Sequence, residues 1–325
     1  METINIADRL LDKIDEKENP AIVGLDPILD NIPGFLKKRI ADYDDSFKGV
    51  RDTIIEFNKM IIDQVADLIP AVKPQMAYYE QYGSEGVRAF EKTVSYAREK
   101  GLIVIEDAKR NDIGSTALAY SAGHLGRVSL GNGESIPSYD VDYLTITPYL
   151  GSDGIEPFIN KCQGNSKGVF ILVKTSNPSS GELQDKIVDS GKKVYELMAE
   201  YVADVGKPLA GKRGYSAVGA VVGATYPGEA EKLRKIMKKN IFLVPGYGAQ
   251  GGGGEDVVPC FNNDGHGAVI NSSRGILYAY NREPYNTKYS PEQFHFAARE
   301  AVVDMKNDIV RALKQADKLP SGWLN

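Results

Sequence analysis

The sequence contains little cysteine or histidine and no long apolar run. Its two cysteines, Cys162 and Cys260, are too few for a disulfide framework and lack the spacing of metal ligands. The three histidines, His124, His266 and His295, are scattered, so we expect no zinc site. No apolar run reaches the roughly 18 residues of a membrane-spanning helix, and the charged, amphipathic N-terminus lacks the apolar core of a signal peptide. A reducing, cytoplasmic location is therefore expected.

The sequence also lacks an excess of basic charge. Its formal net charge is −5, from 39 Lys and Arg against 44 Asp and Glu, which argues against a nucleic-acid partner. A small phosphorylated ligand needs only one local cradle, so the charge does not exclude one. The hydrophobic fraction of 42% is ordinary for a soluble globular protein, and 325 residues can bury a large core.

Short apolar runs alternate with helical patterns along the chain. Eight runs are predicted strands: 21–25, 71–74, 102–107, 143–147, 168–173, 217–223, 241–245 and 268–271. Several are almost continuously hydrophobic, which is typical of parallel strands buried on both faces. Helical patterns cover 53–68, 85–100, 181–205 and 227–239, with a closing helix from about 290 to 316. Eight strands separated by helices predict a (β/α)₈ TIM barrel.

A doubly wound sheet is the alternative architecture. That fold normally has a glycine-rich turn after its first strand, whereas here the first strand ends in Gly-Leu-Asp-Pro and the glycine-rich turn follows the seventh. No change of composition marks a linker, so we expect one domain over residues 1–325. Two polar, turn-rich segments, 28–52 and 127–142, are interpreted as insertions at the surface.

The segment 106–116, EDAKRNDIGST, is the most informative motif. Asp107 and Lys109 lie two residues apart at the end of a buried strand, so their side chains point to the same side. In a barrel, that side faces the mouth where active sites are built. Asp112 follows where the chain turns toward a helix, and an Asp–Lys–Asp array would pair charges that are costly to desolvate alone. The alternative interpretation is a solvated loop with surface ion pairs.

Two further charges end neighbouring strands. Lys73 lies within Ala-Val-Lys-Pro, where a lysine is an improbable core residue, although its ammonium could also extend to solvent. Asp26 ends the first strand. Three neighbouring strands are thus predicted to place charge on one rim.

The loops after the seventh and eighth strands suit a phosphate group. The glycines of 244–254 would let backbone N–H groups surround an anion, and Gln250 could add an amide donor. After the eighth strand, Ser273 precedes Arg274, whose guanidinium can grip phosphate oxygens. Barrel enzymes often bind phosphate between these two loops. A flexible linker is the alternative for the glycine run.

The loop after the fifth strand, KTSNPSSG, carries hydroxyls and free backbone groups that suit the edge of a polar base. A simple turn leading into a helix is an equally good interpretation of these residues taken alone.

Together these motifs resemble those of the orotidine 5′-phosphate decarboxylase family. The resemblance rests on the Asp-x-Lys-x-x-Asp-Ile pattern of 107–113, on Lys73, and on the PGYGAQGG and SSRG loops, and it covers essentially residues 21–280. The form DAKRNDIGSTA, with the long chain and both insertions, is similar to the bacterial type 2 branch. Sugar-phosphate decarboxylases and aldolases of the superfamily carry a related Asp-x-Lys-x-x-Asp element.

The resemblance implies a role for each matching residue. The charged tetrad would comprise Lys73, Asp107, Lys109 and Asp112. Asp112 would enter the active site from the partner subunit, accompanied by Ile113 and Thr116, in a homodimer with shared active sites. The implied substrate-binding residues are Asp26 for the ribose hydroxyls, Ser176 and Pro178 for the pyrimidine, and Gln250 and Arg274 for the phosphate. Ser273 is a further substrate-binding candidate.

The implied reaction converts orotidine 5′-phosphate to UMP and CO₂ in de novo pyrimidine biosynthesis. It would need neither cofactor nor metal, and Lys109 would protonate a carbanion that fixed charges stabilise. Two alternatives are kept open: a Mg²⁺-dependent sugar-phosphate decarboxylase or aldolase of the superfamily, and a non-catalytic nucleotide-binding barrel.

Overall fold

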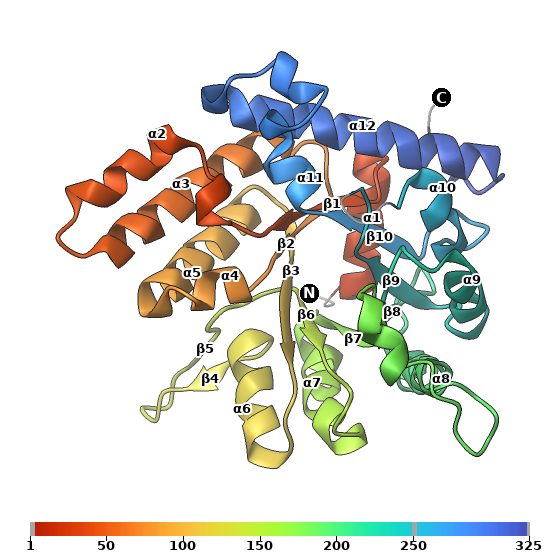
Figure 1. The fold of residues 1–325 in the computed structure, drawn as a ribbon. Helices are drawn as coiled ribbons and strands as arrows, with labels where there is room; N and C mark the ends of the chain where they lie inside the picture. Colours follow the sequence, from red (N-terminus) through yellow and green to blue (C-terminus); the bar gives the residue numbers. More distant parts are fainter. Residues whose placement is uncertain (1–3, 249–251, 324–325) are drawn as a thin grey trace.

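The computed structural model describes residues 4–248 and 252–323, and its centre is a closed barrel of parallel strands (Figure 1). The order around the barrel is β1-β10-β9-β8-β7-β6-β3-β2. The strands are β1 Ala21–Leu25, β2 Ala71–Pro74, β3 Ile103–Arg110, β6 Tyr143–Ile146, β7 Gly168–Lys174, β8 Ser216–Val222, β9 Asn240–Val244 and β10 Ala268–Ser272. The predicted TIM barrel is confirmed, and the doubly wound alternative is wrong.

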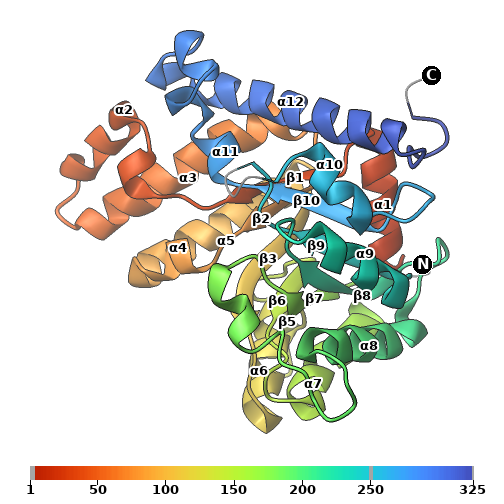
Figure 2. The ribbon, with the colours of Figure 1, turned by 45° about the vertical axis from the view of Figure 1, so that its right-hand side comes forward.

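Helices surround the barrel (Figure 2). They are α1 Ile6–Lys17, α2 Gly34–Lys37, α3 Ser46–Val65, α4 Ala77–Glu80, α5 Gly83–Glu99, α6 Gly114–His124, α7 Ser152–Asn165, α8 Val194–Gly206, α9 Pro227–Ile236, α10 Gly254–Val257, α11 Arg274–Leu277 and α12 Phe294–Gln315. Every residue of β1, β2, β6, β8, β9 and β10 is buried, as expected for strands covered on both faces. In the described part of the chain, no helix is both long and apolar enough to cross a membrane.

The predicted strands agree with the observed ones more closely than the helices do. The bounds of β1 and β2 are those predicted, whereas β3 continues beyond the expected end at Asp107 to Arg110. This extension carries Lys109 within the strand. The pairing of β3 with β6 shifts register between Glu106 and Arg110, so the end of β3 is irregular where the charged motif lies.

Two helix predictions were wrong or incomplete, and several helices were not predicted. The helix expected from 53 begins at Ser46, because the Asp45 side chain accepts the Phe47 N–H at 3.0 Å and caps it. The helix expected over 181–205 is present only as α8, because the chain first makes a turn in which Gly191 adopts a φ of +77°. Helices α6 and α7 were not predicted.

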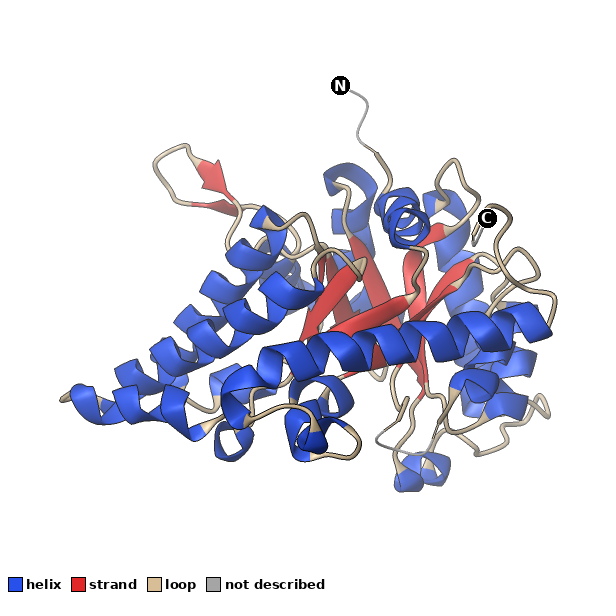
Figure 3. Cartoon of the chain, turned by 90° about the horizontal axis from the view of Figure 1, so that it is seen from above, coloured by secondary structure: helices blue, strands red, loops and turns tan. Residues whose placement is uncertain are grey.

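The two predicted insertions differ in structure. Residues 28–52 form α2, short 3₁₀ turns and the start of α3, and they bury Ile32 and Leu36, so this segment is more than a surface excursion. Residues 127–142 include an antiparallel hairpin of β4 Val128–Ser129 and β5 Ser135–Ile136, which projects from the barrel in Figure 3.

Candidate active site

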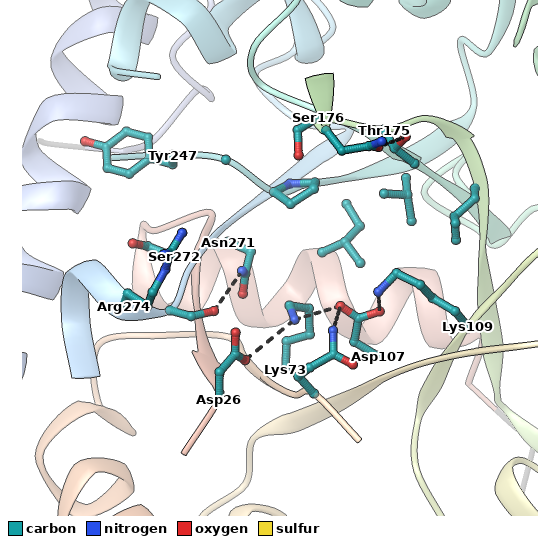
Figure 4. A pocket seen from close by; sticks show the side chains of 18 of the residues that line it. Asp26, Lys73, Asp107, Lys109, Thr175, Ser176, Tyr247, Asn271, Ser272 and Arg274 are labelled. Carbon is teal, nitrogen blue, oxygen red and sulfur yellow. Dashed lines mark hydrogen bonds and ion pairs between the residues drawn. The ribbon is translucent and has the colours of Figure 1, made fainter. Parts of the chain in front are cut away.

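A cavity of about 530 Å³ opens at the carboxyl ends of the barrel strands. In Figure 4, Thr175 and Ser176 lie across it from Lys73 and Asp107. Its polar and charged lining residues are Asp26, Lys73, Gln75, Asp107, Lys109, Thr175, Ser176, Asn177, Gln184, Tyr247, Asn271, Ser272, Ser273 and Arg274. Most of the predicted site residues are therefore brought together by the barrel.

Asp107 is the centre of a charged cluster (Figure 4). Its Oδ2 lies 2.9 Å from the Lys73 Nζ, and its Oδ1 lies 2.7 Å from the Lys109 Nζ. On the other side, the Lys73 Nζ lies 4.0 Å from Asp26 Oδ1. The prediction that β1, β2 and β3 place charge on one rim is confirmed, because these three strands are neighbours in the barrel.

Two neutral side chains complete the hydrogen bonds of this carboxylate. The Gln75 amide donates to Asp107 Oδ2, and the Thr145 hydroxyl donates to Asp107 Oδ1, each at 2.9 Å. Each oxygen of Asp107 thus accepts from one lysine and one neutral donor. Such saturation holds a buried carboxylate in a single orientation.

The charges also shift the pKa values of the buried partners. Burial alone raises the pKa of Asp107, but the nearby ammonium groups of Lys73 and Lys109 outweigh it and hold that pKa below its usual range. Burial alone lowers the pKa of Lys73, and Asp107 and Asp26 reverse this and raise it. Asp107 and Lys73 are therefore both ionised at neutral pH. Lys73 is buried, and the Lys109 side chain is 45% exposed.

The backbone of the motif adopts two unusual conformations. Lys109 has a φ of +50° and Asp112 a φ of +118°, a region that non-glycine residues rarely occupy. The Lys109 N–H donates to the Thr145 hydroxyl at 3.0 Å, which helps to fix the first of these conformations. Strained residues of this kind concentrate at functional sites, where the surrounding structure holds them.

The far side of the cavity comes from the end of β7. Gln184 folds back over this end, accepting the Thr175 N–H at 3.0 Å and donating to the Thr175 hydroxyl at 2.8 Å. Lys174, the last residue of β7, is buried, and its Nζ pairs with Asp185 at 2.9 Å. These contacts anchor the segment that presents Ser176 to the cavity.

The remaining end of the cavity is lined by the loops after β9 and β10. Gly246 and Gly248 adopt φ values of +104° and +73°, which favour glycine, and Arg274 follows Ser272 and Ser273. The Arg274 guanidinium forms no ion pair or side-chain hydrogen bond with residues 4–248 and 252–323. Backbone amides and an arginine at one end of a barrel mouth suit a phosphate.

Two buried oxygens in the cavity lack a hydrogen-bond partner in the described chain, Asp26 Oδ1 and Asn271 Oδ1. Buried polar atoms are normally satisfied, so both are suited to accept from ligand hydroxyls. They lie on β1 and β10, which are neighbours. An added Cβ on Gly24 would lie 1.9 Å from the Ser273 hydroxyl, so glycine leaves room here for the Ser273 side chain.

Five predicted site residues are not among those lining this cavity. They are Asp112, Ile113, Thr116, Pro178 and Gln250, of which Gln250 lies outside the described residues. Asp112 accepts the Ile113 N–H at 2.8 Å, and Ile113 and Thr116 are exposed to solvent. Pro178 begins a 3₁₀ helix, Pro178–Glu182. Within one chain, Asp112, the expected fourth member of the charged tetrad, therefore does not line the cavity with the other three members.

Sequence reasoning missed Gln75, Thr145, Asn271 and Gln184. Gln75 and Thr145 could have been found by asking which polar residues end the strands beside β3, since both lie at that level of the barrel. Gln184 carried no signal, because its segment was expected to be helical.

Comparison with known proteins gives a consistent result. Residues 41–286 match the family model described as "Orotidine 5'-phosphate decarboxylase / HUMPS family". The orotidine 5′-phosphate decarboxylase of Rhodopirellula baltica is 44% identical over 287 residues, which are 88% of this chain and 93% of that protein. That of Caldicellulosiruptor bescii is 43% identical over 85% of this chain and 90% of its own. The structure of Leishmania donovani OMP decarboxylase superposes with a TM-score of 0.67 at 27% identity, covering 94% of this chain and 99% of that one.

Proposed function

Because the chain belongs to the orotidine 5′-phosphate decarboxylase family, we propose that it converts orotidine 5′-phosphate to UMP and CO₂ in de novo pyrimidine biosynthesis. The observation that carries this proposal is the Asp107 carboxylate, which holds the Lys73 and Lys109 ammonium groups at one side of a cavity. The opposite end of the same cavity carries Arg274 and Gly246, which begins the glycine-rich segment after β9. A nucleotide that bears both a phosphate and a second anionic group fits this arrangement.

The substrate would span the cavity between these two ends. Its phosphate would bind Arg274 and the backbone beyond β9. Its ribose hydroxyls would meet the oxygens of Asp26 and Asn271 that accept no hydrogen bond from the described chain. The pyrimidine would then lie between Ser176 and the charged cluster. This placement brings C6 of the ring and its carboxylate close to Lys109.

The reaction then requires stabilisation of negative charge on carbon. The bond from C6 to the carboxylate breaks, CO₂ leaves, and the electron pair remains on C6. The Lys109 ammonium faces that carbon with its charge already fixed by Asp107, so little reorganisation is needed as the charge develops. Lys109 then donates a proton to C6, which gives UMP, and regains a proton from water.

The phosphate end contributes at a distance from the bond that breaks. Binding energy released there holds the ring in the reactive position and organises the surrounding loops. The cavity is thus divided between a region that binds and a region that reacts. We expect no metal or cofactor to be required and the enzyme to act in the cytoplasm.

We further propose that the protein is a homodimer with shared active sites, in which Asp112, Ile113 and Thr116 reach the partner's cavity. The exposure of apolar side chains around α6 and the start of α7 supports this, because such side chains are normally covered. They include Ile113 at 50%, Leu118 at 51%, Tyr120 at 37% and Tyr149 at 76% exposed. The strained backbone at Asp112 also fits a residue that is held for use elsewhere.

Mixing two inactive variants tests the shared sites. Suppose that Lys109→Ala and Asp112→Asn are each inactive. A hybrid dimer of one subunit of each variant then has one site that carries both changes and one site that carries neither. About a quarter of wild-type activity should then return. A mixture that exchanges subunits yet stays inactive would show that each site is built within one chain.

The activity itself is tested by following ultraviolet absorbance as purified protein meets orotidine 5′-phosphate in excess chelator. Conversion to UMP, identified by chromatography, is the expected result. Turnover that requires added Mg²⁺, or turnover of sugar phosphates in its place, would favour a superfamily decarboxylase or aldolase. Binding of UMP without any conversion would indicate a nucleotide-binding barrel.

A further inference from the structure

One carboxylate oxygen on α12 holds both ends of the glycine-rich segment after β9. The Tyr247 hydroxyl donates to Asp308 Oδ2 at 2.7 Å, and the Gly254 N–H donates to the same oxygen at 2.7 Å. The other oxygen, Oδ1, pairs with Arg311 on the solvent side of the helix. A single residue of the last helix thus fixes the segment where it leaves the barrel and where it enters α10.

The surroundings of these two hydrogen bonds are tightly packed. Helix α10 lies against α12 in both views (Figures 1 and 2). Gly254 is buried, and an added Cβ there would lie 2.6 Å from the Asp308 carbonyl oxygen. The Gly248 N–H also donates to the Gly252 carbonyl at 2.7 Å, which draws the two ends of the segment together.

Tyr247 connects the cavity to these two hydrogen bonds, which we call the Asp308 anchor. Tyr247 lines the cavity beside Gly246, and its ring points away from Lys73 and Asp107 (Figure 4). Tyr247 and Asp308 also line a second cavity, of about 330 Å³. Burial, and then the hydrogen bond to Asp308, raise the pKa of Tyr247. The hydroxyl therefore stays protonated at neutral pH and donates the hydrogen bond to Asp308.

We propose that Asp308 is a positioning residue for the phosphate group, acting through Tyr247 and Gly254. It touches neither substrate nor reacting atoms. Backbone that binds an anion through N–H groups must be held in position, and fixing the two ends of this segment beforehand lowers the entropy lost on binding. This inference rests on the proposed function for the identity of its ligand and extends it to a residue more than 50 positions away in sequence.

The same helix provides a matched control. The Tyr285 hydroxyl donates to Asp304 Oδ2 at 2.7 Å, one turn earlier on α12, and both residues line the same second cavity. Neither belongs to the glycine-rich segment. Loss of either tyrosine hydroxyl removes an equivalent hydrogen bond to α12, but only Tyr247→Phe changes the anchor.

The test compares the affinities of UMP and uridine, which differ only in the phosphate, by calorimetric titration. Tyr247→Phe should weaken UMP binding about tenfold and leave uridine binding unchanged, since one hydrogen bond that orders the phosphate site is lost. Tyr285→Phe should change neither affinity. Unchanged UMP affinity in Tyr247→Phe, or equal weakening of UMP and uridine, would overturn the proposal.

Amide hydrogen exchange gives a second test that needs no ligand. Exchange of peptides covering 252–257 should be at least several-fold faster in Asp308→Ala than in Asp304→Ala, because only the former releases the Gly254 N–H. Equal exchange in the two variants would overturn the anchor. If wild-type protein fails to bind UMP or to decarboxylate orotidine 5′-phosphate, the proposed function fails, and the anchor is then judged by exchange alone.

Discussion

The two ends of the cavity are built in different ways. At the β1–β3 end, Asp107 accepts four hydrogen bonds from Lys73, Lys109, Gln75 and Thr145, so the side chains hold one another. At the β9–β10 end, the lining includes Gly246, Ser273 and Arg274, and the Arg274 guanidinium forms no ion pair with any described residue. The hydrogen bonds of Asp107 at the first end are satisfied before a ligand arrives, whereas the second end presents donors that a ligand would satisfy.

This difference indicates separate roles, with the β1–β3 end stabilising charge in the reaction and the β9–β10 end binding the phosphate. Charge that must stabilise a short-lived carbanion is most effective when it is already oriented. Donors for a phosphate need no partner within the chain, because the ligand stays bound throughout the reaction and completes their hydrogen bonds. The predictions that follow separate the two ends, from the largest expected effect to the smallest.

Lys109→Ala should have the largest effect. It removes both the fixed positive charge and the proton donor, so kcat should fall by about 10⁴-fold or more. UMP affinity should change by only a few-fold, since the phosphate end is untouched. Steady-state kinetics and titration with UMP measure the two quantities. Turnover near that of the wild type would exclude Lys109 as the proton donor.

Asp107→Asn should damage both activity and stability. The buried Lys73 loses its closest counter-charge, and breaking a buried pair from one side costs about 3 kcal/mol of unfolding free energy. Activity should fall because the Lys109 ammonium is no longer held at its position. Urea denaturation and kinetics provide the measurements, and full stability in this variant would contradict the view that the charges are mutually supported.

Arg274→Ala should affect the other end alone. Loss of a charge-assisted hydrogen bond to phosphate should lower kcat/KM for orotidine 5′-phosphate by about 100-fold. Unfolding free energy should stay within about 0.5 kcal/mol, because no described residue depends on this side chain. An unchanged kcat/KM would show that the phosphate binds elsewhere.

The pH dependence of stability should be the smallest effect. Asp107 has a lowered pKa, so its contribution is present above its unfolded value of about 3.9 and is lost as pH falls through its folded value. Lys73 has a raised pKa, so its contribution is present below about 10.4 and is lost as pH rises through its folded value. The stability difference between wild type and Asp107→Asn should therefore be flat from about pH 5 to 9. A marked slope in this range would contradict the assignment.

Much of the barrel could be predicted from sequence, because the residue pattern that identifies each strand lies within a few consecutive residues. Continuous apolar runs gave β1 and β2 with their observed bounds, and strand alternation placed Asp107 and Lys109 on one side. Helix α7 was missed because it contains Pro157, which usually ends a helix.

The partners of the charged motif could not be predicted in the same way. Gln75 and Thr145 meet Asp107 because their strands flank β3 at a particular register. Register depends on how the whole barrel closes, which no single segment encodes. The anchor at Asp308 is similar, since it joins α12 to a loop more than 50 residues earlier.

The claim that the phosphate end and the charged end have separate roles is tested most directly by turnover of orotidine, the substrate without its phosphate. We predict slow decarboxylation of orotidine with the same kcat/KM in wild type and Arg274→Ala, although the two differ about 100-fold on orotidine 5′-phosphate. If Arg274→Ala lowers kcat/KM equally for both substrates, then the phosphate end also takes part in building the charged end, and the two are not separate.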